Sequence, residues 1–318
     1  MNVLPLGLRV RVVSALVEGS SLRATARMTE TDRESVGKLL ANVGGGCARL
    51  HDGMMRELRC DVLELDELWA YVFKKEGHRR EDDPPEWGDQ YTWVAIDART
   101  KLVPVYRVSK RDGVAANAFA AELRARVLGR PQITTDGFRP YVEAIELAFG
   151  CNVDYAQVLK TYRADESNGA SRDDVRYSRG RVTRSVKRVV IGAPDEDLIS
   201  TSYAERGNLT VRMGQRRFTR LTNGFSKLAT MLQHAVALHY SHYNLCRVHE
   251  TIRVTPAMEA GVTDHVWSLA ELIEAALKAP EAPPLPRPVR LSRPLPAPVG
   301  RPPAVDVLPG QLTLPGVL

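Results

Sequence analysis

The sequence predicts an α/β protein in which a mixed β-sheet flanked by helices follows a small, all-helical N-terminal domain. Three stretches with helical spacing lie in the first 53 residues, and from residue 60 onward strand patterns alternate with helical ones. The chain has 318 residues, 44% of them hydrophobic, which is enough to bury a sizeable core. We therefore expect a helical domain at 1–53, an α/β domain at 60–278 and a disordered tail at 279–318.

The N-terminal 53 residues carry start and stop signals for three helices. "LRVRVVSALVEG" predicts a helix that ends at Gly19, and Ser21 is placed to cap a second one, "LRATARM". In "TDRESVGKLLANVGGG", Thr31 with Glu34 three residues later forms a capping box. The three glycines then predict that this third helix stops after Val43.

The tight turn between the second and third helices favours a helix-turn-helix. Its sequence, "TET", lacks the usual glycine, so a generic three-helix bundle is the alternative. In the helix-turn-helix interpretation, Arg33, Ser35 and Lys38 on the third helix face the major groove of DNA.

The α/β domain has the order strand, strand, strand, helix, strand, helix, strand. The strand patterns are "CDVLELDELWAYV", the two halves of "QYTWVAIDARTKLVPVYRV", "PQITTDGF" and "CNVDYAQVL". The helical patterns are "VAANAFAAELRARVL" and "YVEAIELAFG". This order implies a mixed sheet with helices packed on it.

Two acids, Asp66 and Asp136, are expected at or near the ends of buried strands. Acids at strand ends often serve turns, and Asp97 in "DARTK" is assigned that structural role. Asp66 differs because Leu65 and Leu68 flank it in a stretch that should be largely buried. A buried acid needs a compensating partner, and a hard cation is one such partner.

The net charge of +6 is modest, but basic residues are concentrated in two acid-free segments. One spans Arg176 to Arg188. The other spans 206–249, and its basic residues are Arg206, Arg212, Arg216, Arg217, Arg220, Lys227 and Arg247. Such clustering favours a polyanion such as double-stranded DNA as the partner, and a solvated surface is the alternative.

Composition also excludes several classes of protein. There is no run of 18 apolar residues and no signal-peptide pattern, so we expect no membrane contact and a cytoplasmic, nucleoid-associated location. The four scattered cysteines form no C-x-x-C pair, which favours reduced thiols. Twelve of the last 39 residues are proline, so this segment cannot build a core.

Four stretches carry a resemblance to a known family. "LELDELW", "TTDGFRPY", "STSYAERGNLTVRMGQRRFTRLTNGFSK" and "HYNLCRVHETIRVTPAMEAGV" resemble the DDE transposases of bacterial insertion sequences, in the IS-one-like group. The resemblance runs from about Asp61 to Leu277 and implies an RNase H-like fold for the sheet domain. It also implies assembly into a homo-oligomer of two or more copies. The chain lacks the N-terminal zinc-finger cysteines of that group, which leaves end recognition to the helix-turn-helix.

The resemblance further implies that Asp66, Asp136 and Glu205 are the catalytic and metal-binding triad. Phosphodiester cleavage needs an activated nucleophile and a stabilised leaving oxygen, which two Mg²⁺ (or Mn²⁺) ions supply together. Magnesium prefers carboxylate oxygens, so a few convergent acids suffice.

Glu205 is expected in the first turn of a helix, pointing toward the two aspartates. Arg212 and Arg216, seven and eleven residues later, would share its face and hold the DNA backbone. A capping box of Ser202 with Glu205 competes with this interpretation, and Glu166 is the fallback for the third acid.

Two possible functional roles are considered for the stretch "HYSHYNLCRVHE". His242, Cys246 and His249 resemble a zinc site without an evident fourth ligand, so we favour a helix end packed on the core. Tyr240 and Tyr243 are candidates for stacking on extruded bases.

Together these patterns predict a transposase that binds inverted-repeat DNA ends, nicks them with water, and joins the freed 3′-hydroxyl to target DNA. The alternatives are a DNA-binding regulator or decayed transposase without catalysis, and a nuclease that cleaves without joining. Metal binding that depends on Asp66 and Asp136 would separate the regulator from the enzymes.

Overall fold

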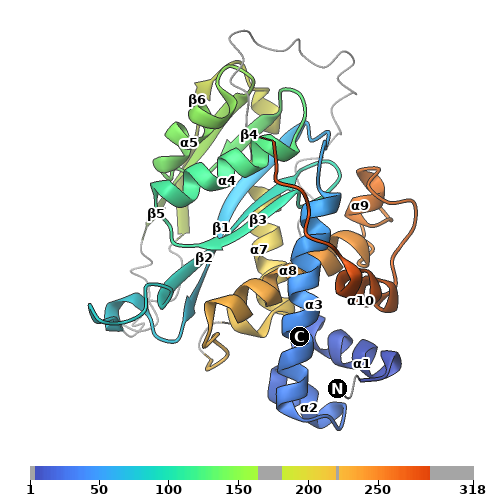
Figure 1. The fold of residues 1–318 in the computed structure, drawn as a ribbon. Coiled ribbons are helices and arrows are strands. Elements are labelled where there is room, and N and C mark those ends of the chain that lie inside the picture. Colours follow the sequence, from blue (N-terminus) through green and yellow to red (C-terminus); the bar gives the residue numbers. More distant parts are fainter. Residues whose placement is uncertain (1–3, 164–180, 220–221, 287–318) are drawn as a thin grey trace, which may run out of the picture.

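The structure, a computed structural model, describes residues 4–163, 181–219 and 222–286. Its centre is a six-stranded mixed sheet with the strand order β3-β2-β1-β4-β5-β6 (Figure 1). β1 to β3 pair antiparallel, β4 and β5 run parallel to β1, and β6 is antiparallel to β5. The strands are Val62–Val72 (β1), Gly88–Asp97 (β2), Val105–Ser109 (β3), Gln132–Thr135 (β4), Asp154–Arg163 (β5) and Arg181–Ile191 (β6).

The first five strands have the RNase H-like arrangement, and the predicted order of strands and helices is confirmed. The sixth strand, β6, was not predicted. Its side chains from Val182 to Val189 are exposed on both faces, so they show no alternation of buried and polar positions. Pairing with β5 through the backbone holds this basic segment at the sheet edge.

Helices cover both faces of the sheet (Figure 1). α4 and α5 pack on one face, whereas α7 and α8 lie on the other. The helices are Leu6–Val17 (α1), Leu22–Met28 (α2), Arg33–Met54 (α3), Gly113–Arg126 (α4), Pro140–Phe149 (α5), Ser202–Gly214 (α7), Ala229–Leu245 (α8), Pro256–Glu259 (α9) and Leu269–Lys278 (α10), with single 3₁₀ turns at Glu76–His78 (η1), Glu196–Leu198 (η2) and Arg216–Phe218 (η3). No helix in these described ranges is long and apolar enough to cross a membrane.

The side chains of β1 alternate between the two helical layers. Leu63 and Leu65 join the core beneath α4 and α5, whereas Leu68 joins the core beneath α7 and α8. Even-numbered positions of β1 therefore face α7 and odd-numbered positions face α5. This alternation decides where the acids of β1 point.

The third N-terminal helix, α3, is longer than predicted. It runs through the three glycines to Met54, and Asp32 rather than Thr31 caps its start by accepting the N–H groups of Glu34 and Ser35. The prediction of a stop after Val43 was wrong because the glycines serve packing. A Cβ at Gly44 would collide with the backbone of α8, and one at Gly46 with the backbone of α10.

The N-terminal helices and the sheet domain therefore share a hydrophobic core. Val12 of α1, Val43 of α3 and Ala276 of α10 belong to the same buried cluster as Leu65 and Ile133 of the sheet. The three predicted N-terminal helices are present, and α3 is a long strut that connects them to the rest of the molecule.

The first residues of the predicted disordered tail lie against α3. Arg49 Nε donates to the carbonyl oxygen of Ala279 at 2.8 Å, and Arg56 donates to that of Pro283. The remainder of the tail, 287–318, lies outside the described residues.

Candidate active site

Two of the predicted acids lie level with each other because of how β1 pairs with β4. The two strands run parallel, with Glu64 opposite Thr134. Two residues further, the same register brings Asp136, which directly follows β4, beside Asp66. Asp136 lies at a strand end as expected, whereas Asp66 lies inside its strand because β1 continues to Val72.

Two acids on one face of β1 fix the position of α7. The buried Glu64 carboxylate accepts the backbone N–H groups of Tyr203 and Ala204 at 2.7 and 2.9 Å, in the first turn of that helix. Burial raises the pKa of Glu64, while these two donors lower it. Asn208, further along α7, donates to Asp66 Oδ2 at 2.7 Å. Glu64 is a structural acid that sequence reasoning missed.

The predicted capping box of Ser202 with Glu205 does not form. The N-cap of α7 is Thr201, which makes no side-chain capping bond, and the Ser202 N–H donates to Ser200 Oγ. Glu64 supplies the cap instead, from a strand about 140 residues away in sequence. The Glu205 carboxylate is therefore not used to close the helix.

Asp136 is held by a turn and by its neighbours in the sheet. Its Oδ1 accepts the N–H of Phe138 at 2.9 Å, and its carbonyl oxygen accepts Gln157 Nε2 at 3.1 Å and Thr135 Oγ1 at 2.7 Å. The side chain is 43% exposed. Asp136 thus also serves a turn, as acids at strand ends often do, and its Oδ2 remains directed toward the site.

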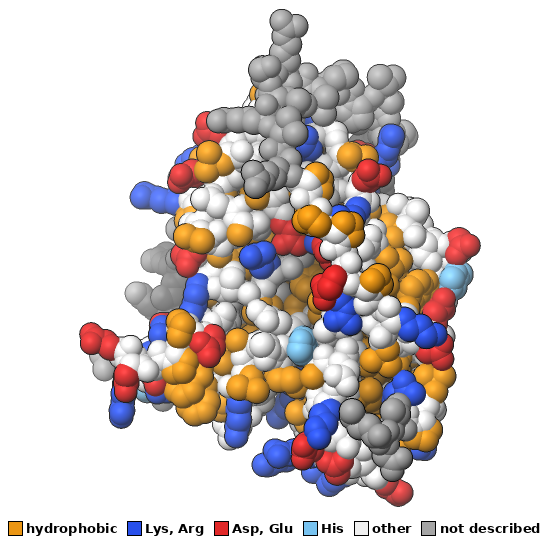
Figure 2. Space-filling model, viewed as in Figure 1, with side chains coloured by type: hydrophobic (Ala, Val, Ile, Leu, Met, Phe, Trp, Pro, Cys, Tyr) orange, Lys and Arg blue, Asp and Glu red, His pale blue; other side chains and the backbone are white. Residues whose placement is uncertain are grey.

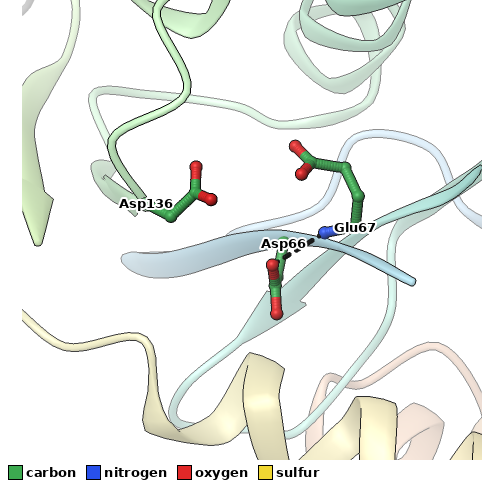
Figure 3. Close-up of side chains that lie close together, drawn as sticks. All are labelled: Asp66, Glu67 and Asp136. Carbon is green, nitrogen blue, oxygen red and sulfur yellow. Dashed lines mark hydrogen bonds between the residues drawn. The ribbon is translucent and has the colours of Figure 1, made fainter. Parts of the chain in front are cut away.

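Sequence reasoning missed a third acid of the cluster, Glu67. One carboxylate oxygen each of Asp66, Glu67 and Asp136 lies within 4.8 Å of the others. Figure 3 shows how these three side chains lie around β1. Arg111 Nε donates to Glu67 at 3.1 Å and its Nη2 lies 3.5 Å from Asp136 Oδ2. Burial, reinforced by the charge of Asp136, raises the pKa of Glu67 to about 7. An acid at an odd, core-facing position of β1 was the available signal.

Glu205 lines the same cavity but forms hydrogen bonds with residues outside the group of Asp66, Glu67 and Asp136. Its Oε1 accepts the Nζ of Lys160, from β5, and the Oγ1 of Thr201 at 2.9 Å. Lys160 Nζ also donates to Thr201 Oγ1 at 3.2 Å. The predicted helix position is confirmed, while Glu205 stands outside the group that Asp66 and Asp136 form.

The cavity has a volume of about 720 Å³ and combines acids with bases. Asp66, Asp136 and Glu205 contribute the carboxylates, and its basic lining residues are Arg111, Arg139 and Lys160. Acids can hold metal ions and bases can hold phosphate oxygens, so the lining fits a metal-dependent reaction on a phosphodiester.

The donor atoms fit a hard cation. Within the described ranges, Asp66, Glu67 and Asp136 are the one group of three or more candidate ligands, and all donors are carboxylate oxygens, which suit Mg²⁺ and Mn²⁺. Two close carboxylates repel each other by roughly 4 kcal/mol at an effective dielectric of 20, a cost that a cation relieves.

The alternative interpretations of the α8 end are not supported. His242, Cys246 and His249 form no ligand group in the described chain, and Cys246 Sγ contacts the carbonyl oxygen of Ser268 at 3.9 Å. The proposal that Tyr240 and Tyr243 stack on bases was wrong, because both are buried in the core beneath α7 and α8.

The predicted groove-facing residues lie at the start of α3. Arg33 and Lys38 are exposed, and Lys38 pairs with Glu34 at 2.8 Å on the same helix face. Ser35 is half-buried and donates its N–H to the Asp32 cap. Figure 2 shows Lys and Arg side chains interspersed with acids over this lower end of the molecule.

Some basic residues of the segment after Glu205 are exposed on the surface, whereas others have a structural role. Arg206 and Lys227 are exposed, and Arg212 is in the last turn of α7. Arg216 does not share the face of Glu205 as expected, because α7 ends at Gly214 and Arg216 begins η3. Arg220 lies outside the described residues, as do Glu166, Arg176 and Arg179.

Arg217 has a structural role within that segment. Its Nε donates to Ser226 Oγ at 2.9 Å, and burial lowers its pKa to about 10.

The assignment of Asp97 to a turn is confirmed as well. Asp97 Oδ2 accepts Thr100 N and Oγ1, and Lys101 adopts a φ of 63°.

Comparisons with known proteins agree with this geometry. Residues 87–191 match a family model described as a DDE domain, of the IS240 transposase type. The matched segment runs from the start of β2 to the end of β6 and contains Asp136. Among curated proteins, no sequence matches the chain.

Similar solved structures include two transposases. The synaptic complex of piggyBac transposase with hairpin DNA is 11% identical with a TM-score of 0.37, over 86% of this chain and 69% of that one. The Mos1 strand transfer complex is 13% identical with a TM-score of 0.21, over 49% and 59%. The Mos1 paired-end complex with the left transposon end is 13% identical with a TM-score of 0.20, over 49% of this chain and 60% of that one. The chain thus covers less than two thirds of the Mos1 chains.

An RNase H-like sheet with two aspartates level on adjacent parallel strands defines a carboxylate-dependent enzyme of nucleic-acid phosphodiesters. The family match makes the comparison more specific. Residues 87–191 match the DDE domain of insertion-sequence transposases.

Proposed function

We propose that Asp66, Asp136 and Glu205 hold Mg²⁺ or Mn²⁺ ions with which this transposase cleaves DNA at inverted-repeat ends and joins the freed 3′ ends to target DNA. The observation that carries the proposal is the β1–β4 register, which brings Asp66 and Asp136 together at a cavity. The placement of the protein in the IS-one-like group is part of the proposal.

The bound ions would supply an activated water or 3′-hydroxyl and would stabilise the leaving oxygen. The protein's own groups do the positioning. Asn208 orients the Asp66 carboxylate, and Gln157 and Thr135 hold the backbone of Asp136. Arg139, at the cavity wall, is placed to contact the phosphate oxygens of the scissile strand.

DNA recognition would be divided between two surfaces. Arg33, Ser35 and Lys38 would read the inverted repeat, and the cations around α7 and η3 would hold the backbone near the cavity. Those backbone cations are Arg206, Arg212, Arg216, Arg220 and Lys227, with Arg217 supporting the loop. Joining two ends to one target calls for at least two copies of the chain in the assembly.

The test is cleavage and joining of a labelled duplex that carries the inverted repeats flanking the gene, in Mg²⁺ or Mn²⁺. Asp136→Asn should lower both reactions by about 10³-fold or more while DNA binding persists, because it removes a metal ligand. Asp61→Asn is the matched control, since Asp61 is a surface partner of Arg99 and should keep wild-type rates. Full activity in Asp136→Asn would contradict the proposal.

A further inference from the structure

The third acid of the triad is tied to a basic residue that no part of the proposed reaction has used. Lys160 on β5 contacts Glu205, and Thr201 hydrogen-bonds to both side chains. All three line the cavity that contains Asp66 and Asp136. The Glu205 carboxylate therefore points to β5, away from the group of acids on β1 and β4.

Glu205 nevertheless lies within reach of that group. Asn208 is three residues further along the same face of α7, and it donates to Asp66 at 2.7 Å. Residues three apart on a helix have Cβ atoms about 5–6 Å apart. A change of rotamer in the flexible Glu205 side chain can therefore redirect its carboxylate toward Asp66 without moving α7.

Electrostatics explains the present arrangement. A third carboxylate beside Asp66 and Asp136 would be repelled by both, and the Lys160 ammonium neutralises it instead. Lys160 is only 23% exposed and faces the cavity that a DNA phosphate must enter. A phosphate oxygen and the Glu205 carboxylate thus compete for the same ammonium group.

We infer that Lys160 is a positioning residue that holds Glu205 out of the metal site until a DNA phosphate takes its place. In this mechanism, which rests on the proposed function, DNA entry frees Glu205 to complete the metal site. Metal and DNA binding are therefore coupled through Lys160 and, by linkage, each strengthens the other.

The test measures Mn²⁺ affinity by calorimetry on the full chain without DNA. Lys160→Met should bind Mn²⁺ about tenfold more tightly than wild type, because Glu205 is released. Lys160→Arg, which keeps the cation, should retain the wild-type affinity, and both variants should show the wild-type melting temperature. Unchanged or weaker Mn²⁺ binding in folded Lys160→Met would overturn the inference.

A double-mutant cycle separates the release of Glu205 from a simple loss of positive charge. In a Glu205→Gln background, Lys160→Met should give no gain in Mn²⁺ affinity. An equal gain in both backgrounds would show that only charge is involved and would reject the mechanism. Lys187→Met is the control on the adjacent strand β6, where Lys187 contacts the carbonyl oxygen of Glu196, and should leave Mn²⁺ affinity unchanged.

The same titration distinguishes failure of the inference from failure of the proposed function. Asp66→Asn and Asp136→Asn should weaken Mn²⁺ binding whatever Lys160 does. If they bind Mn²⁺ as tightly as wild type, the metal site itself is misplaced. If they lose Mn²⁺ while Lys160→Met gains nothing, the site stands and the role of Lys160 is rejected.

Discussion

The two halves of the candidate site are built in different ways. Asp66 and Asp136 are placed by hydrogen-bonded pairing of parallel strands, and their relative position is fixed by backbone register. Glu205 is placed by a helix that lies on the sheet, and its position depends on side chains such as Glu64 and Asn208. The sheet thus fixes two acids, whereas the third can be repositioned.

The largest predicted effect comes from removing the contacts that attach α7 to the sheet. Glu64→Ala removes the acceptor for two N–H groups in the first turn of the helix, so we expect a loss of about 3 kcal/mol in the free energy of unfolding. Urea denaturation measures this loss. Glu34→Ala, which breaks a pair with Lys38 that is exposed to solvent, should leave the free energy of unfolding almost unchanged. Equal effects of the two changes would mean that Glu64 does not anchor α7.

A second prediction concerns the helical layer behind α7. Gly46→Ala should lower the free energy of unfolding by about 2 kcal/mol, because the new methyl group collides with the backbone of Ala276 in α10. Gly53→Ala on the same helix meets no neighbour and should stabilise by up to about 1 kcal/mol. Thermal or urea unfolding of the pair checks whether α3 is the packed strut described above. Equal stability of Gly46→Ala and Gly53→Ala would show that Gly46 does not pack tightly against α10.

The smallest predicted effect, counted per pH unit, is a pH dependence of the helical layer. His51 of α3 is buried against Tyr106, and burial together with the charge of Arg126 lowers its pKa to about 3. The unfolded chain takes up a proton near pH 6.5, whereas the folded chain does not. The stability contributed by neutral His51 is therefore present above pH 6.5 and is lost as the pH falls toward 3.

The expected loss is about 1.4 kcal/mol for each pH unit within this window. His51 Nε2 lies 3.1 Å from the Val103 carbonyl oxygen. His51→Phe loses this contact but keeps a ring against Tyr106, and the Val103 carbonyl oxygen still accepts Asn244 Nδ2 at 2.9 Å. Unfolding at several pH values should therefore show a shallower acid dependence for the variant. Parallel curves for the two proteins would mean that His51 is protonated in the folded state.

The sequence allowed the sheet to be predicted because its strands are apolar and local in pattern. Asp66 and Asp136 followed from those strands, together with the resemblance. Glu64 and Lys160 could not be assigned, since their partners lie far away in sequence on α7. A pairing between β5 and a helix 45 residues later leaves no periodic signal.

The glycines of α3 misled the prediction for a related reason. A run of glycines ends most helices, because glycine costs about 1 kcal/mol in a helix interior. Here α8 and α10 approach so closely that no Cβ fits at Gly44 or Gly46. The compensating contacts come from residues near 234 and 276, which only the folded chain brings to α3.

The central claim is that the β1–β4 register builds a metal site from Asp66 and Asp136. The most direct measurement is anomalous X-ray scattering from crystals soaked in Mn²⁺. The account predicts an anomalous peak at coordinating distance from carboxylate oxygens of both aspartates, absent in Asp136→Asn crystals. A Mn²⁺ peak elsewhere in the molecule, with none between Asp66 and Asp136, would contradict it.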